Sequence, residues 1–240
     1  MWFALLIPLL AALAETTDRQ TRTVPLPEGR AIAIEATVGS VRIDGWDKPE
    51  AEITIERRVP TPAHQARLPI EIDDGPSRLV IRAVQADGGT DPSLRVDIVL
   101  RVPRAALIDM VRVMEGRIAI NSFRGSLTAD LRRGPIDATD VSGTLRLDTG
   151  IGPITITAAR LLPGGLLRAR AFNGAVRLRL SERPADARIM ALALNGTITS
   201  AIPLTMKDTW GPRWGEATLG KGEPVISLDV VTGTIDIRSP

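Results

Sequence analysis

The sequence predicts an all-β protein built as a parallel β-helix, or solenoid, with a strand-rich cap region at its N-terminal end. Glycines recur every nine residues in the middle of the chain, at Gly116, Gly125, Gly134, Gly143 and Gly152. Apolar residues occupy the second and fourth positions after each of these glycines. A constant period with alternation inside it indicates one short strand and one glycine turn per unit, stacked so that equivalent residues lie above one another. An aromatic content of only 3% also fits flat aliphatic stacking.

Residues 15–108, before the repeat, form a strand-rich part of a different kind. Alternating apolar and polar residues lie between turn signals such as Asp74-Gly75-Pro76. We expect strands at 30–36, 39–43, 51–59, 68–72, 78–84 and 94–102. Gly39 opens a Gly-x-apolar-x-apolar unit like those of the repeat. This part is therefore expected to cap or begin the stack, within a single domain that covers residues 15–240.

Residues 109–240 are expected to form the repeat coils. Two nine-residue edges make one coil of 18 residues, because alternate glycines of the series are 18 residues apart. After Gly152 the next glycines of the series are Gly174 and Gly196, so the coil widens to 22 residues. A last unit that begins at Gly233 is expected to close the chain.

Three further features of the coils follow from the same pattern. Edges without a glycine are expected at 166–172 and 188–194. The segment 203–224 is rich in glycine and proline, so we expect a loop that interrupts the last coil. The fifth position of each unit is small or polar and suits a corner, where side chains bond backbone groups that leave the strand ladder. These residues are Asn121, Asp130, Thr139, Asp148 and Thr157.

Residues 1–14 have the features of a secretory signal peptide. The run from Trp2 to Ala14 is apolar apart from Pro8 and ends in the small-x-small pattern Ala12-Leu13-Ala14. It is shorter than the roughly 20 residues that span a bilayer. No Lys or Arg precedes it, which departs from the usual pattern, and a buried N-terminal element is the alternative. We therefore expect an exported protein, in the periplasm or at the cell surface, with no transmembrane span in the mature chain.

The inventory of reactive residues argues against an enzyme. His64 is the single histidine, no Gly-x-Ser-x-Gly motif is present, and the chain has no cysteine. No catalytic residue, metal or cofactor is therefore expected. The alternative is a carbohydrate-active β-helix enzyme that acts on acidic polysaccharide, which needs clustered carboxylates on one outward face. Asp137, Asp140 and Asp148 are the candidates for such a cluster.

Arginines gather in residues 160–188. This stretch has seven arginines against two acidic residues, a local charge of +5, whereas the whole chain carries +2. Alternation with apolar residues places Arg168, Arg170, Arg177 and Arg179 on outward faces of edges expected to be neighbours. Such a surface can bind a cell-envelope glycan, an anionic lipid or another envelope protein, and a solvated arginine face is the plainer alternative. Nucleic acid is not expected, because no aromatic residues alternate with the arginines.

Two tryptophans form a second candidate contact. Trp210 and Trp214 lie four residues apart in the glycine- and proline-rich segment. Their rings can stack on a sugar or a protein groove, or can fold back to cover the end of the stack.

Several strings of the sequence resemble the bacterial putative-adhesin family, exported proteins catalogued as a domain of unknown function. The strings are VGSVRIDGWD (38–47), VDIVLRVP (96–103), GRIAI (116–120), LNGTI (194–198), LGKGE (219–223) and TGTIDIR (232–238). The resemblance covers residues 30–238. It implies a right-handed, mostly parallel β-helix and offers no catalytic residue to transfer. The function it implies is a non-enzymatic surface for adhesion, scaffolding or envelope binding.

The leader sequence generates a direct prediction. The exported product should begin at Glu15, because cleavage follows Ala14 in the small-x-small pattern. N-terminal sequencing of the protein recovered from the envelope fraction measures this. A cytoplasmic pool that retains Met1 would contradict both the leader and the expected location.

Overall fold

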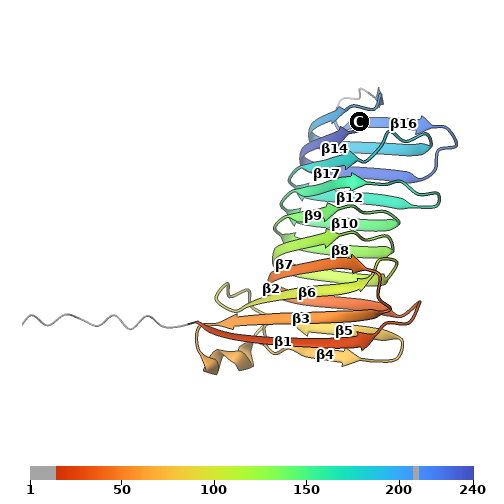
Figure 1. Ribbon diagram of the computed structural model, residues 1–240. Coiled ribbons are helices and arrows are strands. Elements are labelled where there is room, and N and C mark those ends of the chain that lie inside the picture. Colours follow the sequence, from red (N-terminus) through yellow and green to blue (C-terminus); the bar gives the residue numbers. More distant parts are fainter. Residues whose placement is uncertain (1–14, 208–210) are drawn as a thin grey trace, which may run out of the picture.

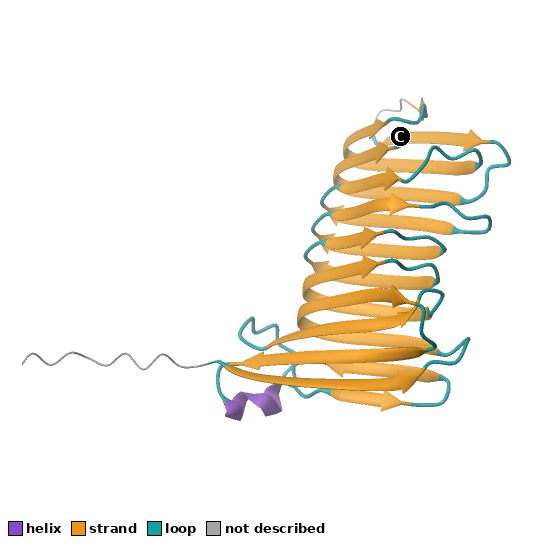
Figure 2. Cartoon of the chain, viewed as in Figure 1, coloured by secondary structure: helices purple, strands orange, loops and turns teal. Residues whose placement is uncertain are grey.

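The computed structural model describes residues 15–207 and 211–240. Strands dominate this part of the chain, and the 3-10 helix η1 (Pro62–Arg67) lies at one end of the molecule (Figures 1 and 2). The expected all-β class is therefore confirmed. No helix among the described residues is long and apolar enough to cross a membrane. The expected signal peptide, residues 1–14, lies outside the described residues.

Six strands form the N-terminal part, and one of them, β2, covers two of the strands expected from the sequence. They are β1 (Thr16–Pro25), β2 (Ala31–Trp46), β3 (Glu50–Val59), β4 (Glu71–Asp74), β5 (Arg78–Ala83) and β6 (Arg95–Pro103). The strands expected at 30–36 and 39–43 are both parts of β2. The pairs β1–β3, β3–β6 and β4–β5 are antiparallel, whereas β2 pairs in parallel with β5, β6 and β7.

Eleven strands follow, and their register confirms the expected spacing of 18 and then 22 residues. Leu145 lies opposite Leu127 on one side and opposite Leu167 on the other. The strands are β7 (Leu107–Asn121), β8 (Ser126–Arg133), β9 (Ile136–Thr139), β10 (Thr144–Ile151), β11 (Ile154–Ala159), β12 (Leu166–Asn173), β13 (Val176–Leu180), β14 (Ala187–Ser200), β15 (Thr205–Lys207), β16 (Arg213–Leu219) and β17 (Val225–Arg238).

The topology of the sheet corrects the expected right-handed parallel β-helix or solenoid. Eight strands pair in parallel in a closed ring, in the order β7, β8, β10, β12, β17, β13, β11, β9 and back to β7. The ring closes because the long strands β7 and β17 run on through the corner and pair with two successive strands each. The 17 strands of the described residues belong to one mostly parallel sheet, and these eight strands form its closed part. The nine-residue period predicts strand and turn positions, but it contains no signal for strands that continue through a corner.

The place of the last strand is a second correction. Gly196 was expected to stack directly on Gly174, with the Gly233 unit closing the chain. Instead β17 lies between β12–β13 and β14, so that Ile235 is opposite Val176 on one side and Ile198 on the other. The C-terminal strand is thus inserted inside the stack.

Two smaller expectations are also wrong. The segment 203–224 is not wholly a loop, because β15 and β16 form an antiparallel pair that continues onto β14. Asp130 and Asp148 lie in mid-strand, in β8 and β10, and not at corners. The other three fifth-position residues do end or nearly end strands, and the residues after them, Ser122, Asp140 and Ala158, have φ of 52–54°.

The core consists of columns of aliphatic side chains. The second and fourth positions after each of the five repeat glycines are at most 1% exposed, as the alternation predicted. They continue into the N-terminal part through Val41 and Ile43, and into the C-terminal part through Ile235 and Ile237. One core therefore runs through both parts of the chain, and the expected division at residue 108 falls inside β7.

A column of glycines lies at one corner of the sheet. A Cβ atom built on Gly116 would lie 1.6 Å from the carbonyl oxygen of Gly39, and one on Gly134 would lie 1.8 Å from that of Gly116. The same contact, at no more than 2.0 Å, recurs along the column. Its members in spatial order are Gly39, Gly116, Gly134, Gly152, Gly174, Gly233 and Gly196. No other residue fits here, because real Cβ atoms do not approach an oxygen this closely.

The glycine column predicts a large difference between two glycine-to-alanine variants. Gly134→Ala should cost more than about 4 kcal/mol of unfolding free energy or prevent folding, because both its φ of 135° and its Cβ contact are prohibitive. Gly88→Ala should cost only about 1 kcal/mol, since Gly88 has a φ of 70° but open space around it. Urea denaturation measures both. Equal costs would mean that the column is not sterically required.

Candidate binding surface

The outward side chains of five strands form one continuous face, which we call the outer face. It comprises β10, β12, the first half of β17, the first half of β14, and β16, which neighbour one another in that order. The pairing register arranges its side chains in columns that run across the strands. The residues of this face are Arg146, Asp148, Arg168, Arg170, Phe172, Ser227, Asp229, Val231, Met190, Leu192, Leu194, Trp214 and Glu216.

Arg168 and Arg170 lie near the middle of the outer face, on β12. Arg168 is opposite Arg146 on β10, and Arg170 is opposite both Asp148 on β10 and Asp229 on β17. Both arginines are exposed. Among the described residues, neither has a carboxylate oxygen within 4.0 Å. These guanidinium groups interact electrostatically with the two aspartates. Their N–H groups, however, form no hydrogen bond to a carboxylate of the described residues.

The two aspartates beside Arg170 are half-buried, and this changes their acidity. Burial raises the pKa of Asp148 above its usual range, and the nearby Arg168 and Arg170 only partly oppose the increase. The pKa of Asp229 is raised for the same reason. The two aspartates of the outer face therefore become protonated, and lose their negative charge, at a higher pH than ordinary surface aspartates.

Arg177 and Arg179 lie on a different part of the sheet. They belong to β13, which pairs with β11 and β17 but not with β12. Arg177 is opposite Thr155 and Asp236, and Arg179 is opposite Arg238. The four arginines predicted from the sequence are therefore two separate pairs, one on each of two strands that do not neighbour each other. Alternation predicts that a side chain points out of the core, but it does not predict on which side of the molecule its strand lies.

The arginines differ in ion pairing between the two ends of the chain. Toward the N-terminal end many hold a carboxylate, such as Arg117 with Asp137 at 2.8 Å and Arg133 with Glu115 at 3.1 Å. Within the described part of residues 134–215, no arginine forms an ion pair. These residues are Arg146, Arg160, Arg168, Arg170, Arg177, Arg179, Arg183, Arg188 and Arg213. The local excess of positive charge found in the sequence is therefore also an excess of guanidinium groups without acidic partners.

An apolar ridge borders the arginines of the outer face. Phe172 is 61% exposed and Leu194 is 40% exposed, and Val231 lies between them in the register. Ile151, at the end of the neighbouring strand β10, is 49% exposed. Phe172, Val231 and Leu194 all stand two residues before a glycine of the column. The sequence analysis did not predict this ridge, although an apolar residue two residues before a column glycine is a pattern visible in the sequence.

Of the two tryptophans, Trp214 is on β16 and Trp210 lies outside the described residues. Trp214 is half-buried and opposite Leu192, so it extends the apolar part of the outer face toward the end of the stack. Its indole Nε1 donates a hydrogen bond to Glu216 Oε2 at 3.4 Å. Glu216 in turn accepts from Lys207 Nζ at 2.9 Å.

The three carboxylates proposed for a sugar-cleaving site do not converge. Asp137 lies on β9 and pairs with Arg117, Asp148 lies on the outer face, and Asp140 follows β9 at a corner. No group of three or more potential metal ligands is found among the described residues. His64 lies in η1, at the other end of the molecule from the outer face, and its Nδ1 is 2.8 Å from Thr61 Oγ1 (Figure 2).

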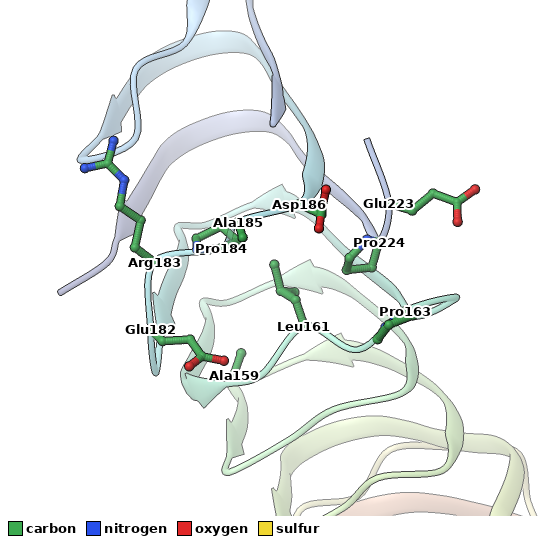
Figure 3. Close-up of a pocket in the computed structure, with 10 residues that line it drawn as sticks. All are labelled: Ala159, Leu161, Pro163, Glu182, Arg183, Pro184, Ala185, Asp186, Glu223 and Pro224. Carbon is green, nitrogen blue, oxygen red and sulfur yellow. The ribbon is translucent and has the colours of Figure 1, made fainter. Parts of the chain in front are cut away.

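A cavity of about 340 Å³ lies among the loops that follow β11 and β13 and precede β17. Figure 3 shows that Arg183 and Glu223 lie on opposite sides of it, and that the side chains of Arg183 and its chain neighbour Glu182 point in different directions. Asp186, also in its lining, accepts a hydrogen bond from the backbone N–H of Lys221 at 2.7 Å. The lining therefore presents scattered charges and no set of groups that meet at one point.

Comparisons with known proteins address the fold. No family model matches the chain, and no curated protein matches its sequence. A solved structure of a putative cell adhesion protein from Clostridium sporogenes is 12% identical over 94% of this chain and 100% of its own, with a TM-score of 0.55. A putative adhesin from Bacteroides fragilis is 14% identical over 92% and 97%, with a TM-score of 0.41.

A third structure, a putative lipid binding protein from Parabacteroides distasonis, is 11% identical over 92% and 96%, with a TM-score of 0.30. The TM-score of 0.55 to the Clostridium sporogenes protein shows a shared fold. The resemblance to the putative-adhesin family that the sequence strings indicated is thus confirmed at the level of fold. This chain is similar in fold to a solved bacterial protein described as a putative cell adhesion protein.

Proposed function

We propose that this protein is an exported, non-enzymatic binding protein whose outer face docks on an anionic component of the cell envelope, for adhesion or scaffolding. The observation that carries the proposal is the pair of exposed guanidinium groups on β12, which form no ion pair within the described part of the chain and lie beside an exposed apolar ridge. Arg168, Arg170 and Phe172 alternate along one strand and project from the same side of it.

The chemistry of this face fits an anionic lipid headgroup best. A guanidinium group offers a planar fork of donors that matches the oxygens of a phosphate or carboxylate. Phe172 and Leu194 add an apolar strip within two strand spacings, roughly 10 Å, of the arginines. A lipid supplies both a charged headgroup and long apolar chains, whereas the apolar part of an acidic glycan is limited to the faces of its sugar rings.

A non-enzymatic role is supported by the arrangement of reactive groups. Catalysis by carboxylates needs two of them at a fixed separation around one bond. Asp137 and Asp148 lie on strands that do not pair with each other, and the loop cavity has scattered charges. Export is supported by the leader pattern of residues 1–14 and by the shared fold with a putative cell adhesion protein.

A first test of this proposed function uses the two arginine pairs. Replacing Arg168 and Arg170 together by serine should weaken binding to vesicles that contain phosphatidylglycerol by roughly 30-fold, since each arginine near an anionic surface contributes about 1 kcal/mol. Vesicle co-sedimentation measures the change. Binding by the unchanged protein should also fall steeply with added salt, because salt shortens the Debye length from about 10 Å at 0.1 M to about 3 Å at 1 M.

The matched control is the double replacement of Arg177 and Arg179 by serine. It removes the same charge from another part of the sheet and should leave binding within about threefold, with an unfolding free energy close to that of the other variant. Phe172→Ser should weaken binding without changing its salt dependence. Equal losses of binding in the two double variants would contradict a specific role of the outer face. Binding to an acidic glycan but not to vesicles would show that the ligand is a glycan and not a lipid.

The second prediction concerns pH. Because the pKa values of Asp148 and Asp229 are raised, both carboxylates gain protons while a phosphodiester is still ionised. Vesicle binding should therefore strengthen as the pH falls below neutral, because protonation of these carboxylates makes the face more positive. Asp148→Asn should bind more tightly at neutral pH and show a flatter pH profile. Asp137→Asn, away from the outer face, is the control, and an unchanged profile in Asp148→Asn would contradict the assignment.

A further inference from the structure

The second half of β14 is an open edge of the sheet. Residues 188–193 of β14 pair with β16 on one side and with β17 on the other, but residues 195–200 pair only with β17. Figure 1 places β14 near the end of the stack that is far from β1. Among the described residues, no strand covers the other side of this six-residue segment.

The backbone groups on this open side can be assigned from one hydrogen bond. The N–H of Ala201 donates to the carbonyl oxygen of Ile237 in β17, at 2.9 Å. Successive residues of a strand direct their backbone groups to alternate sides. The backbone groups of Ile198 and Ser200 therefore face away from β17, and within the described part of the chain no backbone hydrogen bond is made by either on that side.

The composition of this edge sets it apart from the edge at the other end. Residues 195–200, Asn-Gly-Thr-Ile-Thr-Ser, contain neither charge nor proline. β1, which pairs only with β3, is an edge strand with Asp18, Arg19 and Arg22 and ends at Pro25. Charged residues and proline are the usual means of preventing edge pairing. The β14 edge lacks these protections and is suited to receive another strand.

The inner side of this edge also has space. A hollow of about 200 Å³ lies beside it, lined by Ile198, Ser200, Ile202, Pro203, Leu204 and Met206. Ile198 is the last residue of a core column that includes Val176 and Ile235. An added strand would continue the column and place an apolar side chain over Ile198.

We propose that this edge binds an extended partner segment of the form Gly-x-apolar-x-apolar, as a parallel strand that continues the sheet. The glycine is required for the same reason as within the chain. At each glycine of the column from Gly116 on, the carbonyl oxygen of the preceding glycine lies where a Cβ atom would stand, and Gly196 is the last of them. A residue placed over Gly196 would meet its carbonyl oxygen in the same way. The described units of this kind in the chain are already stacked on one another, so the segment comes from another polypeptide.

Synthetic peptides test the proposal. The probe is a labelled peptide that copies residues 231–238, VTGTIDIR, and fluorescence anisotropy should show saturable binding with a Kd below about 1 mM. The same peptide with valine in place of glycine should bind at least about tenfold more weakly. N-methylation at its aspartate should abolish binding, because that N–H would face Ile198. N-methylation at the isoleucine that follows, whose N–H would face away, is the matched control and should have little effect.

Hydrogen exchange locates the site. The bound peptide should slow amide exchange at Ile198 and Ser200 and leave the corresponding amides of β1 unchanged. No saturable binding, equal binding by the valine peptide, or protection elsewhere would each overturn the proposal. A concentration-dependent dimer that protects the same two amides while the peptide fails to bind would also overturn it, in favour of pairing with a second copy.

Discussion

The close contact between glycines at one corner is the constraint on which the rest of the structure depends. Each carbonyl oxygen of the column occupies the place that a Cβ atom would take on the next glycine, at separations of 1.6–2.0 Å. Strand spacing in a sheet is about 4.8 Å and the side-chain period is two residues, so fixing one residue of each strand fixes the register of the whole strand. A slip by one residue would put a side chain against a carbonyl and turn every core residue outward.

The same register determines the surface. Because equivalent residues align across the strands, outward side chains also form columns, and one of them runs through Glu35, Arg112, Asp130, Asp148, Arg170 and Asp229. Opposite charges alternate in part of this column, which stabilises neighbouring strands modestly. Burial, together with a smaller repulsion from the adjoining Asp130, raises the pKa of Asp148. The binding properties of the outer face therefore follow from the register that the glycines impose, and not from loops added to it.

The sequence period was sufficient to predict the strands, the buried positions and the spacing of 18 and 22 residues, because these depend on local geometry repeated in each unit. It was not sufficient to predict the place of β17. Gly196 follows Gly174 by 22 residues, as a stacked neighbour would, and nothing local shows that the Gly233 unit separates them. It also could not show that Arg168 and Arg177 lie on strands that do not pair, since alternation predicts which side chains are buried but not which strands are neighbours. Phe172 was predicted to lie in a strand, but its exposure depends on what neighbouring strands leave uncovered.

The insertion of β17 links the fold to the outer face. Arg170 on β12 and Leu192 on β14 are both opposite Asp229 of β17, so the residues of β12 and the apolar residues of β14 are joined into one face only through the last strand. β14 is made before β17 and cannot take its final place until β17 lies between it and β12. Contacts between residues far apart in sequence form slowly, because the entropy of closing the loop is lost before the contacts stabilise it. We therefore expect the outer face, and with it the open edge at Gly196, to be completed late in folding, after the earlier strands have formed the column on which β17 is placed.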